Sequence, residues 1–177
     1  MINLGPTKTG DLEIYLPLYK RRRDPTDLTI HIDYLRPLDP KLVAPGRNLG
    51  VFRECERSKL VETVRLDQLK LISFLEAGES RIKGTERFSR LRKKSDHVLL
   101  GAEGFLNFME YQHKIPPELR SNTLVFDGTI FSSEGHCCVA AMEWNIYRWR
   151  GILIWLADDF YCHHFSVAVP YHGGLSK

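Results

Sequence analysis

The chain has 177 residues, of which 43% are hydrophobic and 27% charged, and its formal net charge at pH 7 is +3. This composition indicates one soluble globular domain and excludes a largely disordered chain. The longest apolar run, Gly151–Ala157, is much shorter than the roughly 20 residues that span a bilayer. The segment Met1–Gly10 lacks the pattern of a signal peptide. We therefore expect a cytoplasmic protein with reduced cysteines and no membrane partner.

Two alternating segments near the amino terminus predict a β-hairpin, followed by an irregular connection up to residue 50. Leu12–Tyr19 alternates loosely and contains Pro17, which is typical of an edge strand. Leu28–Leu35 alternates cleanly between apolar and polar residues and predicts a half-exposed strand. The basic run Lys20–Arg23 would lie at the tip of this hairpin. Prolines and a glycine make Arg36–Gly50 the best candidate for a segment boundary.

The middle of the chain, residues 51–117, reads as helical. Apolar residues at helical spacing predict a helix from an N-cap at Ser58 to a C-cap at Gly78. An alternative remains open, because Val61–Leu66 alternates and Asp67 is a suitable cap for a shorter helix, Gln68–Ala77.

Two further helices are expected in this middle segment. Thr85–Lys94 starts with a threonine suited to an N-cap position, and its apolar residues lie on one face. Ala102–His113 carries an apolar stripe at helical spacing and is stopped by the pair Pro116-Pro117. Strands on both sides of a helical middle predict the α+β class rather than alternating βαβ units.

Residues 122–170 predict a four-stranded antiparallel meander, because β-branched and aromatic residues dominate four short runs. The expected strands are Leu124–Phe131, Cys137–Trp144, Trp149–Leu156 and His163–Val169. Ser132–Gly135 supplies a turn residue suited to positive φ, whereas Asn145–Arg148 is not a standard Asn-Gly or Asp-Gly hairpin signal. Trp144 and Trp149 flank this second turn, and we expect them to pack together across it.

A zinc site is one hypothesis for the carboxyl-terminal sheet. His136 and Cys138 share one face at the start of a strand, and Cys162 and His164 do so at the start of another. In a meander, alternate strands start at the same end of the sheet, and cysteine and histidine are zinc ligands. The alternative is that the cysteines are small buried hydrophobes and the histidines lie exposed at the end of the sheet. No other cofactor is expected.

The same residues suggest a second hypothesis, a thiol enzyme. Cys138 or Cys162 would act as a nucleophile beside His136 or His164, with Asp158 orienting the histidine. No local motif supports this arrangement, so no catalytic residue is assigned. Phosphate-binding glycine loops and the His-Glu-x-x-His zinc motif are absent from the sequence.

Basic residues predict a surface for nucleic acid or for a protein partner. Cations crowd Arg81–Lys94, and together with the basic run near the amino terminus they would neutralise phosphates. The candidate contact residues are Arg21, Arg22, Arg23, Arg87, Arg90, Lys93 and Lys94. The alternative is an ordinary solvated helix face, because the overall charge is low.

The carboxyl-terminal third carries a distinct pattern of residues: Phe126–Thr129, then Trp144-Asn145 with Arg148-Trp149, then Trp155-Leu156 with Asp158–Phe160. This pattern resembles that of small, uncharacterised bacterial proteins, a resemblance that implies no function. We therefore expect a non-enzymatic binding or accessory protein that contacts a protein or nucleic acid through the basic helical surface. The alternative is a metal-dependent or thiol enzyme with its site at the Cys/His end of the sheet.

Overall fold

A computed structural model describes residues 28–32, 39–93 and 96–170. The predicted strand Leu12–Tyr19 lies outside the described residues, as do Arg21, Arg22, Arg23 and Lys94. The second strand of the predicted hairpin is described in part: β1 (Thr29–His31) pairs antiparallel with β3 (Thr63–Arg65). Within the described residues, no helix has the length and apolar character needed to cross a membrane.

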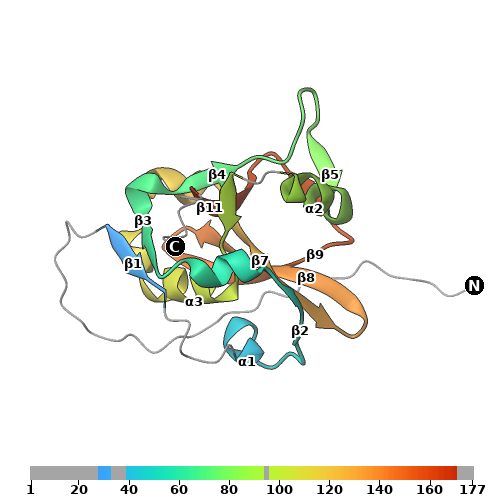
Figure 1. Cartoon of the computed structure of the whole chain (residues 1–177), viewed down its shortest axis with the longest axis horizontal. Helices are drawn as coiled ribbons and strands as arrows, with labels where there is room; N and C mark the ends of the chain where they lie inside the picture. The colour runs from blue at the N-terminus through green and yellow to red at the C-terminus, as the bar shows by residue number, and fades with distance from the viewer. Residues whose placement is uncertain (1–27, 33–38, 94–95, 171–177) are drawn as a thin grey trace, which may run out of the picture.

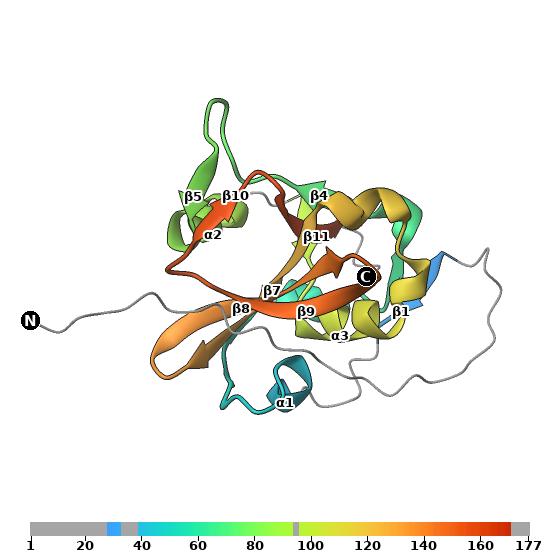
Figure 2. The same ribbon diagram turned by 180° about the vertical axis from the view of Figure 1, so that it is seen from behind.

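The centre of the fold is a mixed sheet in which β7 (Thr123–Ser133) is the longest strand (Figure 1). The strands run in the order β4 (Lys70–Ile72), β11 (His164–Pro170), β7, β8 (His136–Asn145) and β9 (Arg148–Trp155). Two short strands extend it: β2 (Gly50–Glu54) pairs with the second half of β7, and β6 (His97–Leu99) pairs with β11. A separate pair of strands, β5 (Arg81–Lys83) and β10 (Asp159–Tyr161), lies beside α2 (Gly84–Arg92) (Figure 2).

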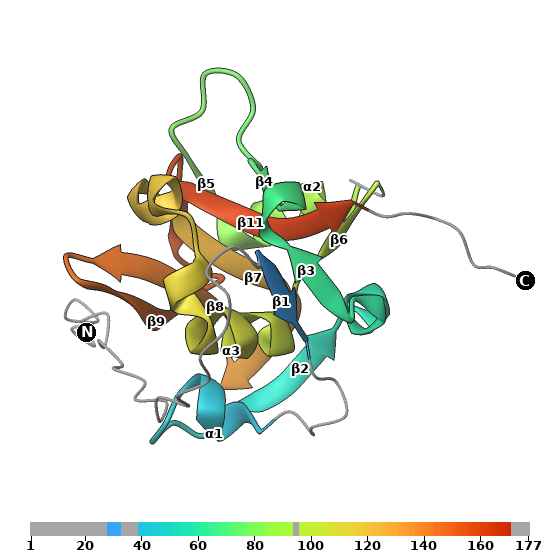
Figure 3. The same cartoon turned by 90° about the vertical axis from the view of Figure 1, so that its left-hand side faces the viewer.

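The remaining elements are short. They are α1 (Pro40–Val43), α3 (Ala102–Glu110) and the 3₁₀ helices η1 (Glu56–Leu60), η2 (Leu66–Gln68), η3 (Gln112–Lys114) and η4 (Pro117–Ser121). Seen from the side, α2 lies on one side of β11 and β7, and α3 lies on the other (Figure 3).

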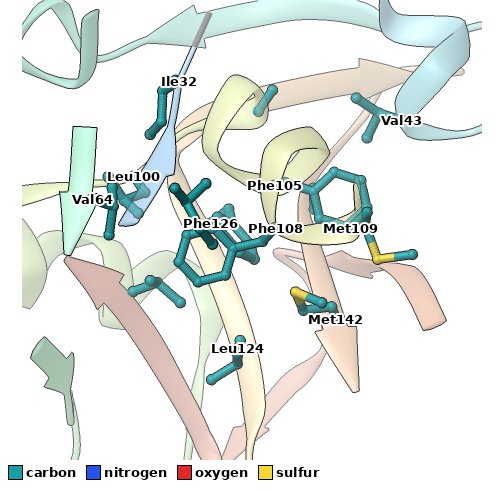
Figure 4. Close-up of a cluster of buried hydrophobic side chains, with 14 of the residues drawn as sticks. Ile32, Val43, Val64, Leu100, Phe105, Phe108, Met109, Leu124, Phe126 and Met142 are labelled. Carbon is teal, nitrogen blue, oxygen red and sulfur yellow. The ribbon is translucent and has the colours of Figure 1, made fainter. Parts of the chain in front are cut away.

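Both faces of the central sheet are therefore buried, because successive side chains of a strand point to opposite faces. On the α3 face, Phe126 makes edge-on contacts with Phe105 and Phe108, with ring centroids 5.6 Å and 5.4 Å apart (Figure 4). On the α2 face, Val125 and Val139 pack with Phe160. Burial on both faces explains why Cys137–Trp144 is apolar at nearly every position, as expected for a central strand.

The α+β class is confirmed, and so is the antiparallel run of β7, β8 and β9. The fourth strand of the predicted meander forms, but the prediction of its position in the sheet is wrong. β11 lies on the far side of β7 and pairs with it in parallel, with His164 opposite Thr123. The chain leaves β9, pairs with β5 through β10, and crosses over before it returns, as a parallel neighbour requires.

The predicted helix Ser58–Gly78 is wrong. The segment forms η1, β3, η2 and β4, followed by a turn in which Gly78 has a φ of 88°. Val64 and Leu66 are buried while Thr63, Arg65 and Asp67 are exposed, so this part of the segment follows the two-residue period of a strand.

The other two helices are confirmed with changed boundaries. α2 starts at Gly84, and Lys83 rather than Thr85 occupies the N-cap position. α3 ends at Glu110, and the 3₁₀ helix η3 replaces its predicted last turn.

The two turns of the meander follow the sequence prediction. The β7–β8 turn has positive φ at Glu134 and Gly135, of 51° and 80°. At the β8–β9 turn, Trp144 pairs with Trp149, and their rings meet edge to face with centroids 5.8 Å apart.

Candidate functional site

A bulge in β7 is the point at which the distant parts of the chain meet. Between Phe126 and Ile130 the pairing with β8 shifts, so Asp127, Gly128 and Thr129 leave the regular ladder. The backbone N–H of Gly128 donates to the Leu100 carbonyl over 2.9 Å, and its own carbonyl accepts from the N–H of Cys55 over 2.7 Å. The Thr129 hydroxyl accepts from the first N–H of α3, at Ala102, over 2.9 Å.

Asp127 of this bulge holds Arg87 of α2 in a buried ion pair. Both nitrogens at the end of the guanidinium donate to the two carboxylate oxygens, and one also donates to the Ser166 hydroxyl over 3.0 Å. The guanidinium lies between two aromatic rings, 4.5 Å from the centre of Phe74 and 4.3 Å from that of Phe160. Both charged side chains are 0% exposed. Arg87 is therefore not the surface cation that the sequence predicted. Its buried ion pair joins α2 to β7.

The other predicted phosphate-binding cations are largely occupied as well. Arg90 donates to Glu79 over 2.9 Å and to Glu86 over 3.1 Å, and the hydrogen bond from Arg90 lowers the pKa of Glu79 to about 2. Arg81 and Lys83 of β5 both pair with Asp159, at 3.3 Å and 2.9 Å.

Of the described candidate contact residues Arg87, Arg90 and Lys93, only Lys93 is exposed. The neighbouring Arg92 is exposed as well, with its guanidinium 5.2 Å from the centre of the Phe88 ring. Arg92 and Lys93 are weak support for a phosphate-binding surface, because such binding depends on several cations acting together and Arg81 and Lys83 are paired with Asp159.

The four predicted zinc ligands do not come together. His136 lies opposite Ser133 at one end of β7, and His164 lies opposite Thr123 at the other. Leu124, next to Thr123, pairs with Met142, which is six residues from His136 along β8, or about 20 Å at roughly 3.3 Å per residue. Cys138 and Cys162 are separated in the same way, because each lies within two residues of its histidine. Among the described side chains, no group of three His, Cys, Asp or Glu is placed to hold a metal ion.

The same geometry contradicts the thiol hypothesis for Cys138. Cys138 is 0% exposed, and burial raises its pKa to about 12. His164 is far along the sheet from that thiol, and burial lowers its pKa to about 4. Cys162 is exposed, with His163 stacked on Tyr161 beside it. A thiol with a raised pKa is a poor nucleophile, since the thiolate is the reactive form.

This contrast predicts selective alkylation of the folded protein. Iodoacetamide at pH 8 should modify Cys162 and leave Cys138 unmodified, because only the first thiol is accessible to the reagent. Peptide mass spectrometry measures both, and the same reaction in urea, where both thiols are exposed, is the control. Modification of Cys138 in the folded protein at the rate of Cys162 would contradict the burial described above.

A second polar cluster was missed in the sequence. Glu103, in the first turn of α3, is buried, and its carboxyl group lies within hydrogen-bonding reach of Glu54 at the end of β2. Burial, followed by the charge of Glu54, raises the pKa of Glu103. Lys59 pairs with Glu54 over 2.8 Å and balances part of the charge. Glu54 and Glu103 are nearly 50 positions apart, so no local sequence pattern predicts that they meet; the fold brings them together.

The turn between β8 and β9 is the most unusual exposed feature. Its two central residues are Ile146 and Tyr147, which are 73% and 87% exposed. Ile146 has a φ of 50°, a conformation that a β-branched residue rarely adopts. The turn projects from the body of the molecule (Figure 3). At its base lie the paired Trp144 and Trp149, with the guanidinium of Arg120 stacked 4.0 Å from the Trp144 ring.

Comparison with known proteins gives no relative for this chain. No family model, no curated protein and no solved structure matches it.

Proposed function

We propose that the protein is a non-enzymatic binding protein that contacts a protein partner through the β8–β9 turn. The observation that carries the proposal is Ile146, which combines a positive φ with an exposed apolar side chain. A non-glycine residue in this region costs about 1–2 kcal/mol. Of the two central residues only Ile146 has a positive φ, and a two-residue turn of this kind favours glycine at that first position, which avoids the cost. Backbone strain of this kind gathers at binding and active sites.

The side chains around the turn have the composition of a binding hot spot. Such spots are enriched in tryptophan, tyrosine and arginine, and Trp144, Tyr147 and Arg120 meet here. The Trp144–Trp149 pair and the stacked Arg120 also hold the base of the turn in place, which limits the entropy lost on binding.

The charges near the turn indicate the chemistry of the partner. Arg120 on η4 is an exposed cation at the base of the turn, with Glu118 the exposed carboxylate on the same 3₁₀ helix. Arg150 is paired with Glu143 over 2.6 Å and adds no net charge. The partner expected is therefore a protein segment that offers an apolar recess for the turn, bordered by Asp or Glu.

A displayed library of random peptides tests this proposal. Peptides selected on the wild-type protein should combine apolar residues with Asp or Glu. They should bind at least tenfold more weakly to the double variant Ile146→Gly with Tyr147→Ser, which removes both exposed apolar side chains. The free energy of unfolding of the same variant should be about 1 kcal/mol higher, because glycine relieves the backbone strain at position 146.

The matched control is Phe52→Ser, which removes another exposed apolar side chain, on β2, and should leave peptide binding unchanged. Peptides that bind the double variant as tightly as the wild type would overturn the proposal. So would binding to vesicles of anionic lipid with no peptide selected, because the turn would then contact a membrane surface.

A further inference from the structure

A second exposed apolar feature lies on the other side of the sheet, along β2. Among the described strands, β2 pairs with β7 alone, so its outer edge presents backbone N–H and C=O groups without a strand beside them. Val51 and Phe52 of this edge strand are 45% and 65% exposed. An open edge of this kind is a template for pairing with another strand.

The geometry of β2 leaves this edge without the usual protection. The pairing shifts between Val51 and Arg53, so Phe52 is the extra residue of a bulge. Val51 and Phe52 therefore do not point to opposite faces of the sheet, as neighbouring residues of a regular strand do. Natural edge strands are commonly guarded by charged side chains. Here Arg53 is turned toward the ring of Phe88 of α2, 5.8 Å away, and Glu54 is turned toward Lys59.

We infer that β2 of a second copy of this chain pairs with this edge, antiparallel and across a two-fold axis. Two observations favour an identical partner. The exposed pair, Val51 and Phe52, is uncharged, so two copies meet there without the repulsion that a charged edge would produce. The two charged residues of β2 are already engaged within their own chain. This inference is independent of the proposed function, which concerns the opposite edge of the sheet.

The expected dimer is weak. One short strand and two apolar side chains bury much less than the roughly 800 Å² per partner of a standard stable interface. Dissociation constants in the micromolar range or weaker are therefore expected.

Analytical ultracentrifugation of the full chain, from low micromolar to near-millimolar concentration, tests the inference. The weight-average mass of the wild type should rise from monomer toward dimer. Phe52→Lys, which places a cation on each copy at an exposed position, should shift the dissociation constant at least tenfold upward. The matched control Tyr147→Ser removes an exposed aromatic residue from the other edge and should leave the dimer unchanged.

Hydrogen exchange locates the contact. The outward-facing amides of Gly50–Glu54 should exchange more slowly at the concentrations where the dimer forms, and those of β9 should not change. A wild type that stays monomeric at every concentration would overturn the inference. So would a dimer that survives Phe52→Lys, or one that is lost with Tyr147→Ser instead.

Discussion

Replacing Asp127 with alanine should lower the free energy of unfolding by about 3–5 kcal/mol, because it leaves a buried arginine without its counter-ion. Arg87 is fully buried, so water cannot replace the lost carboxylate. The remaining partners of the guanidinium are the Ser166 hydroxyl and the faces of Phe74 and Phe160. Urea unfolding measures the loss as a lower midpoint.

The double variant Arg87→Met with Asp127→Leu should recover most of this stability. A buried ion pair replaced by apolar residues of similar volume is often neutral or stabilising, since the cost of removing both charges from water disappears. The matched control is Arg65→Met. Arg65 makes a similar two-point contact with Asp67, at 3.1 Å and 2.7 Å, but both side chains are exposed.

Loss of the exposed Arg65–Asp67 pair should leave the urea midpoint almost unchanged, because water solvates both charged groups. If Asp127→Ala lowers the free energy of unfolding no more than Arg65→Met does, the Arg87–Asp127 pair does not hold α2 to the sheet.

The sequence contained a signal for the buried Arg87–Asp127 pair. The many cations in Arg81–Lys94 suggested a basic surface instead. Arg87 stands three residues after Gly84 and four before Leu91, so helical spacing places it on the buried face of α2. Its partner Asp127 interrupts an otherwise apolar strand. A lone carboxylate inside a buried strand requires a buried counter-charge, and pairing these two observations would have removed Arg87 from the predicted basic surface.

The position of β11 had no such signal. The residue pattern indicates that His163–Val169 is a strand, but it does not show which strand lies beside it. That choice depends on contacts between residues far apart in the sequence, here Ser166 opposite Val125. The hypothesis of a zinc site depended on the position of β11 in the sheet. The strands themselves were predicted correctly, but the wrong strand order placed the four candidate ligands together. The unusual β8–β9 turn could be recognised from the sequence, because its central residues differ from the Asn-Gly and Asp-Gly pairs that are usual in such turns.

Gly128 should tolerate no side chain, and Gly128→Ala is expected to cost about 3 kcal/mol or more, at the upper end of the overpacking range. A Cβ at this position would lie 2.7 Å from the backbone nitrogen of Gly101 and 2.7 Å from the Leu99 carbonyl oxygen, and in contact with the Ser58 hydroxyl. Two of these neighbours are backbone atoms that cannot rotate away. The bulge of β7 and the start of α3 would have to separate, which breaks the Gly128–Leu100 hydrogen bond.

Gly50→Ala is the matched control, because Gly50 lies on β2 and pairs with the same strand. Its Cβ would meet only the Ser132 hydroxyl, at 3.4 Å, so urea unfolding should show a change within about 0.5 kcal/mol. Near-ultraviolet circular dichroism should also report loosened packing of Phe105 and Phe126 in Gly128→Ala, since both rings lie beside the crossing. Equal stability of the two alanine variants would mean that the chains do not cross at Gly128 as closely as described. The anchoring of α3 to β7 would then depend on the Thr129 hydroxyl and the aromatic contacts alone.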